Sequence, residues 1–419
     1  MSSSSNTANL SEKTERLELE SASLLKQPKA VWAVFFASII AFMGLGLVDP
    51  ILPAIASSLN ASPSEVTLLF TSYNAVMAVA MLITGAISSR IGIKWTLLAG
   101  IIVIAVFSAL GGMAGDVWTI IGLRGGWGLG NALFVATALS AIVTLSGSGT
   151  AKAVILYEAA VGLGISVGPL VGGWLGAISW RGPFLGVAGL MVIAFAGLSL
   201  LMPKASEKSS GDSKDSKASR TSLLAPFRAL RYRSLVVLGL TACFYNIGFF
   251  TLMAYAPFVM GLDEHGLGYV FLAWGVLLAI TSVFTAPKLQ EKFGTVKSMG
   301  MMLFLFALML LAMGIWTDIP WVIIAAVIVA GALLGNNNTL ITTAVMNASP
   351  VERSTASAAY SFLRFLGGAL APFMAGKLAE WFNPHVPFLV GSGFVLLAVL
   401  FIALNHKHVK HVDAVNSGH

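Results

Sequence analysis

The chain has 419 residues, of which 57% are apolar and only 10% are charged, and its formal net charge is +7. This composition excludes an ordinary water-soluble globular protein, because the polar side chains are too few to cover its surface. The basic charge gives no reason to expect nucleic-acid binding, since topology and anionic lipid account for it.

Apolar segments recur along the chain, and each is long enough to cross a bilayer as a helix. Six are expected in the first half, at 31–55, 66–88, 95–113, 118–144, 153–178 and 182–202. Six more follow, at 234–258, 266–286, 298–316, 320–346, 356–381 and 386–404. The sequence therefore predicts an all-α membrane protein with twelve transmembrane helices.

Most lysines and arginines fall in the two tails and in alternate loops, which predicts that both termini are cytoplasmic. Residues 1–30 and 406–419 are expected to be cytoplasmic tails. Residues 203–233 include a Ser, Lys and Asp-rich stretch that is typical of a solvated linker. The linker separates two predicted six-helix bundles, 31–202 and 234–405.

The two halves repeat each other's sequence pattern. Gly168-Pro169 in the fifth segment corresponds to Ala371-Pro372 in the eleventh, and the loop around Gly92 corresponds to the loop around Gly294. Repeated halves indicate two pseudo-symmetric bundles around a central substrate site, with transport by rocking of one bundle against the other.

Four ionisable residues lie well inside the predicted spans: Asp49, Arg124, Glu158 and Arg364. Insertion of an Asp or Arg at a helix centre costs about 2.5 to 3.5 kcal/mol, so these side chains are expected to face a cavity or each other. Structural ion pairs, or side chains that reach an interface, would explain them equally well. Asp49 lies about 27 Å along its helix and Arg124 about 9 Å along an opposed one, which predicts similar depths.

Several uncharged polar residues also lie inside the spans. Interhelical hydrogen bonds would account for them, and they are also candidates to line a substrate cavity. The candidates are Tyr73, Asn74, Tyr245, Asn246 and Asn337.

The fifth segment contains the pattern G-x-x-x-G-P-x-x-G-G without a departure, at Gly164, Gly168, Pro169, Gly172 and Gly173. The loop after the second segment is similar to G-x-L-A-D-R-x-G-R-K, at Gly85, Ser89, Arg90, Gly92 and Lys94. The fourth segment is similar to R-x-x-x-G-x-G from Arg124, with Trp127 for the usual Gln, and the first contains Asp49-Pro-Ile-Leu-Pro53. Together these motifs resemble the major facilitator superfamily and, within it, the twelve-span drug:proton antiporters.

The resemblance implies export of small apolar or cationic compounds in exchange for protons, with coupling at Asp49, Arg124 and Glu158. The glycines of the fifth segment would then act as a hinge or seal, although close helix packing alone explains small residues at this spacing. The loop after the second segment would form a cytoplasmic gate together with Glu291 and Lys292. Its alternative role is a positive-inside anchor, and Ser89, which replaces the family's acid, favours that role.

No G-x-x-x-x-G-K-[ST] loop is present, which argues against ATP as the energy source. We expect no enzyme activity, no metal and no cofactor; the partners would be a small-molecule substrate, protons and the lipid bilayer. A monomer in the bacterial cytoplasmic membrane is the expected state. A metabolite importer or facilitator of the same fold is the alternative, and a non-transporting receptor or scaffold is a more distant one.

Overall fold

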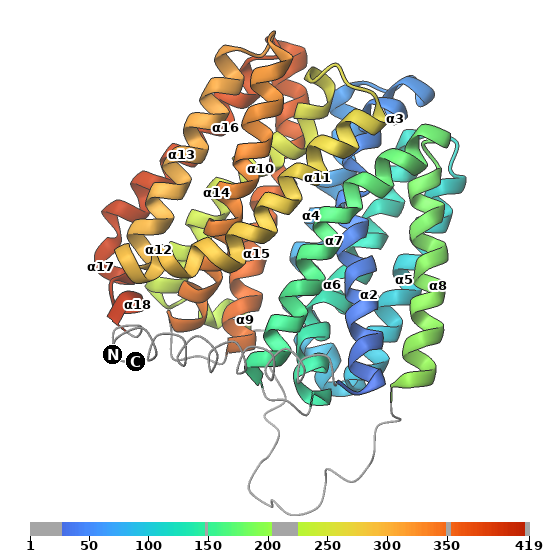
Figure 1. Ribbon diagram of the computed structural model, residues 1–419, viewed down its shortest axis with the longest axis vertical. Coiled ribbons are helices and arrows are strands. Elements are labelled where there is room, and N and C mark those ends of the chain that lie inside the picture. The colour runs from blue at the N-terminus through green and yellow to red at the C-terminus, as the bar shows by residue number, and fades with distance from the viewer. Residues whose placement is uncertain (1–26, 147–149, 203–224, 349–352, 415–419) are drawn as a thin grey trace, which may run out of the picture.

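The computed structural model describes residues 27–146, 150–202, 225–348 and 353–414. Within them, eleven helices are long and apolar enough to cross a bilayer, and they match eleven of the twelve predicted spans. The chain is therefore a multi-pass membrane protein (Figure 1). Most of the expected linker and nearly all of the N-terminal tail lie outside the described residues.

The helices of the first half follow the predicted order. They are α2 (Lys29–Gly46), η1 (Asp49–Ile51), α3 (Leu52–Leu59), α4 (Pro63–Ile91), α5 (Ile93–Met113), α6 (Val117–Leu145), α7 (Thr150–Ile178) and α8 (Gly182–Leu201).

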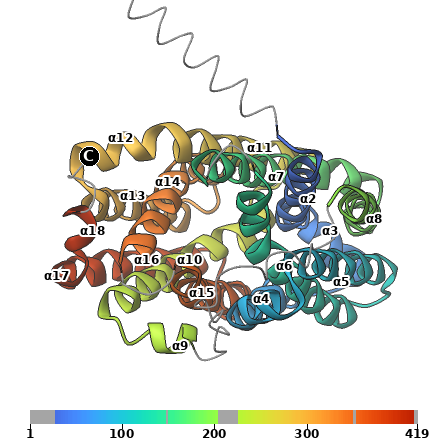
Figure 2. The ribbon, with the colours of Figure 1, turned by 90° about the horizontal axis from the view of Figure 1, so that it is seen from below.

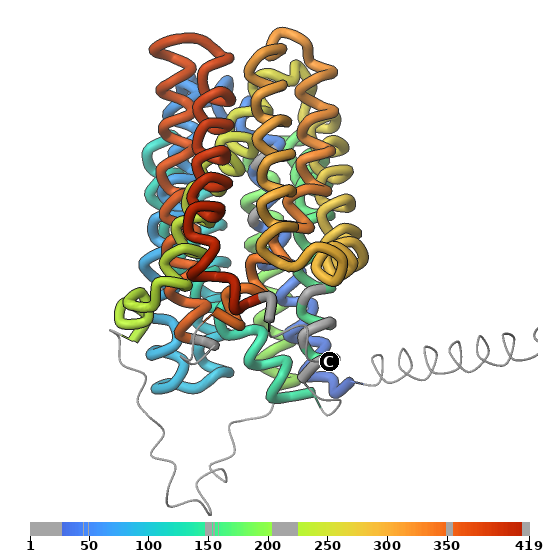
Figure 3. The backbone as a smooth tube through the Cα atoms, turned by 90° about the vertical axis from the view of Figure 1, so that its left-hand side faces the viewer, coloured from blue at the N-terminus to red at the C-terminus, as the bar shows by residue number. Residues whose placement is uncertain are grey.

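The second half begins with a short helix and ends with two more. Its helices are α9 (Ala225–Ala229), α10 (Arg233–Val259), α11 (Glu264–Ile280), the π-helical turn η3 (Thr281–Thr285), α12 (Ala286–Phe293), α13 (Thr295–Ile315), α14 (Pro320–Asn347), α15 (Arg353–Trp381), α16 (Val386–Leu404), α17 (His406–Val409) and α18 (His411–Ala414). Figure 3 shows these helices, coloured yellow-green to red, running lengthwise in front of the first half.

The prediction of one continuous first span, 31–55, was wrong. The α-helix stops at Gly46, and a 3₁₀ turn over Asp49–Ile51 precedes the short helix α3. Pro50 and Pro53 explain the break, because proline offers no backbone N–H and disfavours helical backbone in the residue before it. Asp49 therefore lies in an interruption of the first span.

Two glycines each form a single-residue corner between helices. Gly92 joins α4 to α5 with φ of 86°, and Gly294 joins α12 to α13 with φ of 82°. Residues with a side chain rarely adopt these positive φ values, so glycine suits both corners. Their equivalence gives the repeat between the two halves a structural counterpart.

Side-chain caps fix where three of the long helices begin. Ser62 and Glu65 form a reciprocal capping box at the start of α4, and Asp263 caps α11 through Gly266. Asp116 caps α6, where hydrogen bonds donated by the side chain and backbone of Thr119 lower the pKa of its carboxyl group.

Buried apolar side chains form two clusters, one built almost entirely from the first half and one from the second. The halves meet mainly along two helix pairs, α4 with α15 and α7 with α11 (Figure 2). We call the end of the molecule that carries α3 the α3 end, and the opposite end the α18 end. The two pairs place helices of both halves around the middle of the molecule.

Candidate functional site

The turn that carries Asp49 lies where the two halves meet. Its turn η1 packs against α7 of its own half and against α10 and α11 of the other. The neighbouring residues Val48 and Ile51 are fully buried. Irregular backbone in a membrane helix is tolerated where protein or water surrounds it, and such breaks are typical of transporter binding sites. The side chains of Asp49 and Glu158 lie outside the described part of the structure.

Arg124 is held between two aromatic rings. Its guanidinium carbon lies 4.1 Å from the centre of the Trp127 ring and 4.8 Å from the centre of the Tyr73 ring. Only 2% of Arg124 is exposed. Both distances allow cation–π attraction, which is stronger where water is excluded. Trp127, which the sequence presented only as a departure from the family's Gln, therefore positions Arg124.

A hydrogen bond fixes the Tyr73 side of this arrangement. The amide nitrogen of Asn131 donates to the Tyr73 hydroxyl and also approaches the Ala41 carbonyl of α2, at 3.4 Å. Asn131 was not among the predicted site residues. Its spacing of seven residues from Arg124, which puts both on one face of α6, is the signal that could have identified it. Tyr73, predicted to line a cavity, lies in contact with Arg124.

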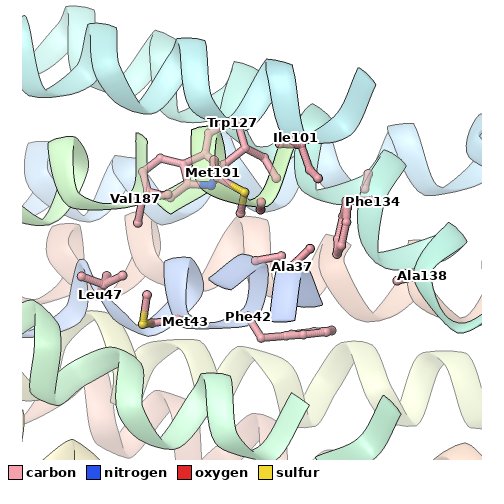
Figure 4. Packing of buried hydrophobic residues seen from close by; sticks show 14 of the residues in the cluster. Ala37, Phe42, Met43, Leu47, Ile101, Trp127, Phe134, Ala138, Val187 and Met191 are labelled. Carbon is pink, nitrogen blue, oxygen red and sulfur yellow. The ribbon is translucent and has the colours of Figure 1, made fainter. Parts of the chain in front are cut away.

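Packing contacts place Arg124 and Asp49 at similar levels. A Cβ added at Gly44 of α2 would lie 3.0 Å from the Trp127 ring, so these two residues face each other. Arg124 precedes Trp127 by about one turn toward the α3 end, and Asp49 follows Gly44 by a little more than one turn in the same direction. Figure 4 shows Trp127 with Val187 and Met191 of α8, over the stretch of α2 that holds Met43 and Leu47.

The glycine motif of α7 consists of contact points for neighbouring backbones. A Cβ at Gly164 would lie 2.6 Å from the Ile39 carbonyl oxygen, and one at Gly168 would lie 2.7 Å from that of Met43. Gly172 meets the carbonyl of Leu47 in the same way. These glycines let α7 lie directly against α2 up to the break before Asp49.

The last glycine of the motif faces the other half. A Cβ at Gly173 would collide with the Glu264 carbonyl oxygen and lie 3.3 Å from Gly268, both on α11. Pro169 also takes part, because a Cβ on Gly268 would lie 3.0 Å from its carbonyl oxygen. The motif thus allows close backbone contact both with α2, inside the first half, and with α11, at the junction of the halves.

Asn74 joins the halves at the second helix pair. Its amide nitrogen donates to the Gly368 carbonyl of α15 at 3.2 Å, and its amide oxygen is buried without a partner among the described residues. The residue was predicted to line a cavity, and the structure places it within the junction between α4 and α15.

The second half holds a polar group of its own, spread over three helices. Arg364 of α15 donates to the Asn338 amide oxygen of α14 at 3.4 Å, and the hydroxyls of Tyr360 and Tyr245 lie beside its guanidinium. Asn337 is 1% exposed, and neither amide atom has a hydrogen-bond partner in the described part of the chain. Asn246 donates to the Ala242 carbonyl of its own helix at 2.9 Å. Tyr360 was not among the predicted site residues.

The residues of the predicted gate lie at the α18 end. Lys94 donates to the carbonyls of Ser199 and Met202, where α8 ends, so it caps a helix of its own half. Ser89 donates to the Ala86 carbonyl at 3.0 Å, and Arg90 is exposed. A Cβ at Gly85 would meet nothing within 4 Å among the described residues, and Glu291 and Lys292 are exposed on α12. The gate stays a prediction.

Comparisons with known proteins agree with this architecture. A family model described as Major Facilitator Superfamily matches residues 34–287 and 259–417. The chain is 56% identical over 391 residues to a Bacillus subtilis (strain 168) protein named multidrug efflux protein YfmO, covering 93% of this chain and 96% of that protein. It is 23% identical to the quinolone resistance protein NorA of Staphylococcus aureus (strain MRSA252), covering 91% and 97%.

Among solved structures, the nucleoside transporter NupG superposes with a TM-score of 0.73 at 12% identity, covering 89% of this chain and 99% of that one. At this identity the likeness concerns the fold alone. The match to the family model and the similarity to the Bacillus protein extend over nearly the whole chain. On these grounds, the chain belongs to the major facilitator superfamily.

Proposed function

We propose that this protein is a proton-coupled antiporter that exports small apolar or cationic compounds by alternating access. Three observations support the proposal: the extensive similarity to a protein named for multidrug efflux, the complete glycine motif of α7, and the arrangement around Arg124. The similarity supports export of drugs as a class, and the geometry supports the coupling.

The break in the first span at Asp49 is the structural observation that carries the coupling. It sets a carboxylate-bearing turn at about the depth of Arg124 and against α10 and α11 of the opposite half. A relative movement of the halves would change the surroundings of this turn directly. Proton uptake at Asp49 in one state and release in the other would then follow from the change in its neighbours.

The proton gradient supplies enough energy for this exchange. One proton crossing a potential of about 100 mV yields roughly 2.3 kcal/mol. A gradient of one pH unit adds about 1.4 kcal/mol. Together they support several-hundredfold accumulation of an uncharged substrate, with no cofactor other than the gradient. Exchange of one proton for a monovalent cation moves no net charge, so the pH gradient alone drives it.

Glu158 of α7 is the second candidate for the proton site. It stands six residues before Gly164, so it lies on the α18 side of the glycine motif. In the proposed cycle, Asp49 serves the α3 end and Glu158 the α18 end. The protein acts as a monomer in the bacterial cytoplasmic membrane with both termini in the cytoplasm, as the charge distribution predicts.

The test uses inverted membrane vesicles loaded with a pH-sensitive dye. Addition of ethidium, a cationic probe, should release protons in vesicles that contain the wild-type chain. Asp49→Asn should abolish this release and leave ethidium binding intact. Asp318→Asn, an exposed loop residue, is the matched control and should behave as wild type.

The result separates the candidate functions. Proton movement unchanged in Asp49→Asn would remove Asp49 from the mechanism. Substrate movement in the opposite direction along the proton gradient would identify an importer, and ligand binding without any flux would identify a receptor or scaffold.

A further inference from the structure

Arg364 is a cation in the middle of a membrane helix without an anionic partner among the described side chains. It stands 11 residues into the 29-residue helix α15. The described acidic residues of the second half all lie at or near helix ends or in connections: Asp263, Glu264, Glu291, Asp318, Glu380 and Asp413. A charge held at this depth normally has a counter-charge or a functional role.

The groups around Arg364 offer hydrogen-bond donors that are not used. Its Nε and the hydroxyls of Tyr245 and Tyr360 are buried, and they lie close enough to interact with one another but form no hydrogen bond of good geometry with any described residue. Tyr245 is 1% exposed and Tyr360 is 5% exposed. Buried polar groups are rarely left unsatisfied, so such a cluster needs an explanation.

A ligand acceptor explains the cluster better than structure does. The Asn338 amide at 3.4 Å supplies one long hydrogen bond to Arg364 and no charge. A structural role would be fulfilled by a carboxylate on α10 or α14, and the described residues of those helices include none. The donors of three helices therefore lie together, and α10 and α14 bring no carboxylate to accept from them among their described residues.

The charge and shape of the cluster specify the chemistry of the ligand. One guanidinium with neutral hydroxyls neutralises a single negative charge. This fits a carboxylate, whereas a phosphate dianion would keep one uncompensated negative charge. Apolar groups adjoin it: the Phe365 ring centre lies 5.9 Å from the guanidinium carbon, and Phe365 packs against the core of the first half. The matching ligand is an amphipathic monocarboxylate.

The cluster also adjoins the junction of the two halves. Gly368, whose carbonyl accepts the hydrogen bond from Asn74 of α4, follows Arg364 by about one helical turn. A ligand held by Arg364 and resting on Phe365 would contact elements of both halves. Its binding would therefore bias their relative position.

We propose that Arg364, Tyr360 and Tyr245 form a carboxylate-binding site, so that the substrates include amphipathic compounds with a carboxylate group. The inference rests on the proposed export function and extends it, because the sequence alone suggested apolar or cationic compounds. Asn338 of α14 adjoins the site through its amide oxygen, 3.4 Å from the Arg364 guanidinium.

The experiment measures equilibrium binding of norfloxacin, a quinolone carboxylic acid, and of its methyl ester to the purified full-length protein in neutral detergent. The wild type should bind the acid at least about tenfold more tightly than the ester, the size of one charge-assisted hydrogen bond. Arg364→Gln should remove this preference, and Arg364→Lys should keep part of it. Tyr360→Phe should reduce it about threefold to tenfold.

Lys297→Gln is the control variant, because it also removes one cation but Lys297 is exposed on α13. This variant should prefer the acid over the ester as strongly as the wild type does. Equal affinities of acid and ester in the wild type, a preference that survives Arg364→Gln, or no binding of the acid would overturn the proposal. Phosphatidylglycerol is tested as a competitor of norfloxacin binding. If it occupies the site more tightly than the acid, and only when Arg364 is present, the site binds lipid and the proposal is overturned as well.

Transport of the same pair in inverted vesicles keeps this inference distinct from the proposed function. Proton-dependent export of the ester and of ethidium, without preference for the acid, would leave the export function standing and refute the carboxylate site. Absence of proton-dependent flux for all three probes would refute the export function, and the binding measurement would still decide the site.

Discussion

The carboxylate of Glu380, near the end of α15, accepts a hydrogen bond from the backbone N–H of Ser64, in the first turn of α4, at 3.2 Å. Lys377 donates to the same carboxylate at 2.9 Å. The first N–H groups of a helix have no partner within the helix and carry partial positive charge. A side chain of the second half thus caps a helix of the first half, and this bond joins the two halves at the α3 end.

In the proposed alternating-access cycle, Glu380→Ala should favour a state that is open at the α3 end, because separating α4 from α15 there would break this bond. The measurement is labelling of Thr67→Cys by an impermeant maleimide, in a chain whose buried Cys243 has been replaced by Ala. We expect the labelling rate to rise about threefold to tenfold, as for one partly exposed charge-assisted bond. Glu65→Ala, which removes a cap within the first half, is the control, and equal rises in both variants would contradict the prediction.

Two adjacent glycines of α7 should respond differently to a single methyl group. In Gly172→Ala the added methyl group would collide with the Leu47 carbonyl within the first half, so we expect the free energy of unfolding to fall by about 1 to 3 kcal/mol. Gly173→Ala pushes on Glu264 across the junction, so we expect stability close to wild type and faster labelling at the α3 end. Gly162→Ala is the control, since its Cβ would have ordinary contact at 3.4 Å. Identical behaviour of the two variants would show that α7 does not divide its contacts in this way.

The aromatic contact at Arg124 gives a prediction about coupling. Trp127→Phe keeps a ring beneath the guanidinium and should retain most of the proton-driven transport. Trp127→Gln restores the residue usual in the family but removes the ring 4.1 Å from the guanidinium carbon, and should lower transport strongly because Arg124 loses this cation–π contact. Proton release on addition of ethidium, normalised to the amount of folded protein, is the measurement. Equal activities of the Phe and Gln variants would exclude a positioning role for the ring.

Lys94 and Arg90 belong to one motif, and the structure separates them. Lys94→Met removes the cap at the end of α8 and should lower the free energy of unfolding by about 0.5 to 2 kcal/mol. Arg90→Met removes an exposed side chain and should leave stability unchanged. Thermal unfolding in detergent distinguishes them, and a destabilised Arg90 variant beside an unaffected Lys94 variant would reverse the assignment.

The helices were predictable from the sequence because a bilayer imposes a minimum length of apolar residues on each span. The break at Asp49 was not recognised, since its neighbours are as apolar as those of a continuous helix. Pro50 and Pro53 were the available signal, and they were interpreted only as part of a motif. Local backbone rules would have corrected the first span.

The site was only partly predictable, for a different reason. Arg124 was identifiable as a charge within an apolar segment, whereas its neighbours Trp127 and Asn131 look like ordinary helix residues. The hydrogen bond between Glu380 and Ser64 joins positions 316 residues apart, and the sequence around either residue does not indicate it. Contacts between the halves depend on how the bundles dock, which local patterns do not encode.

Gly92 and Gly294 each join two helices directly, with no further loop residue between them. Because one residue joins α5 to α4, a displacement of α5 at the α18 end would also move α4, and α4 carries Asn74 and Ser64, which donate hydrogen bonds to α15. The single-residue corner thus connects the α18 end of the first half to the hydrogen bonds that hold the two halves together.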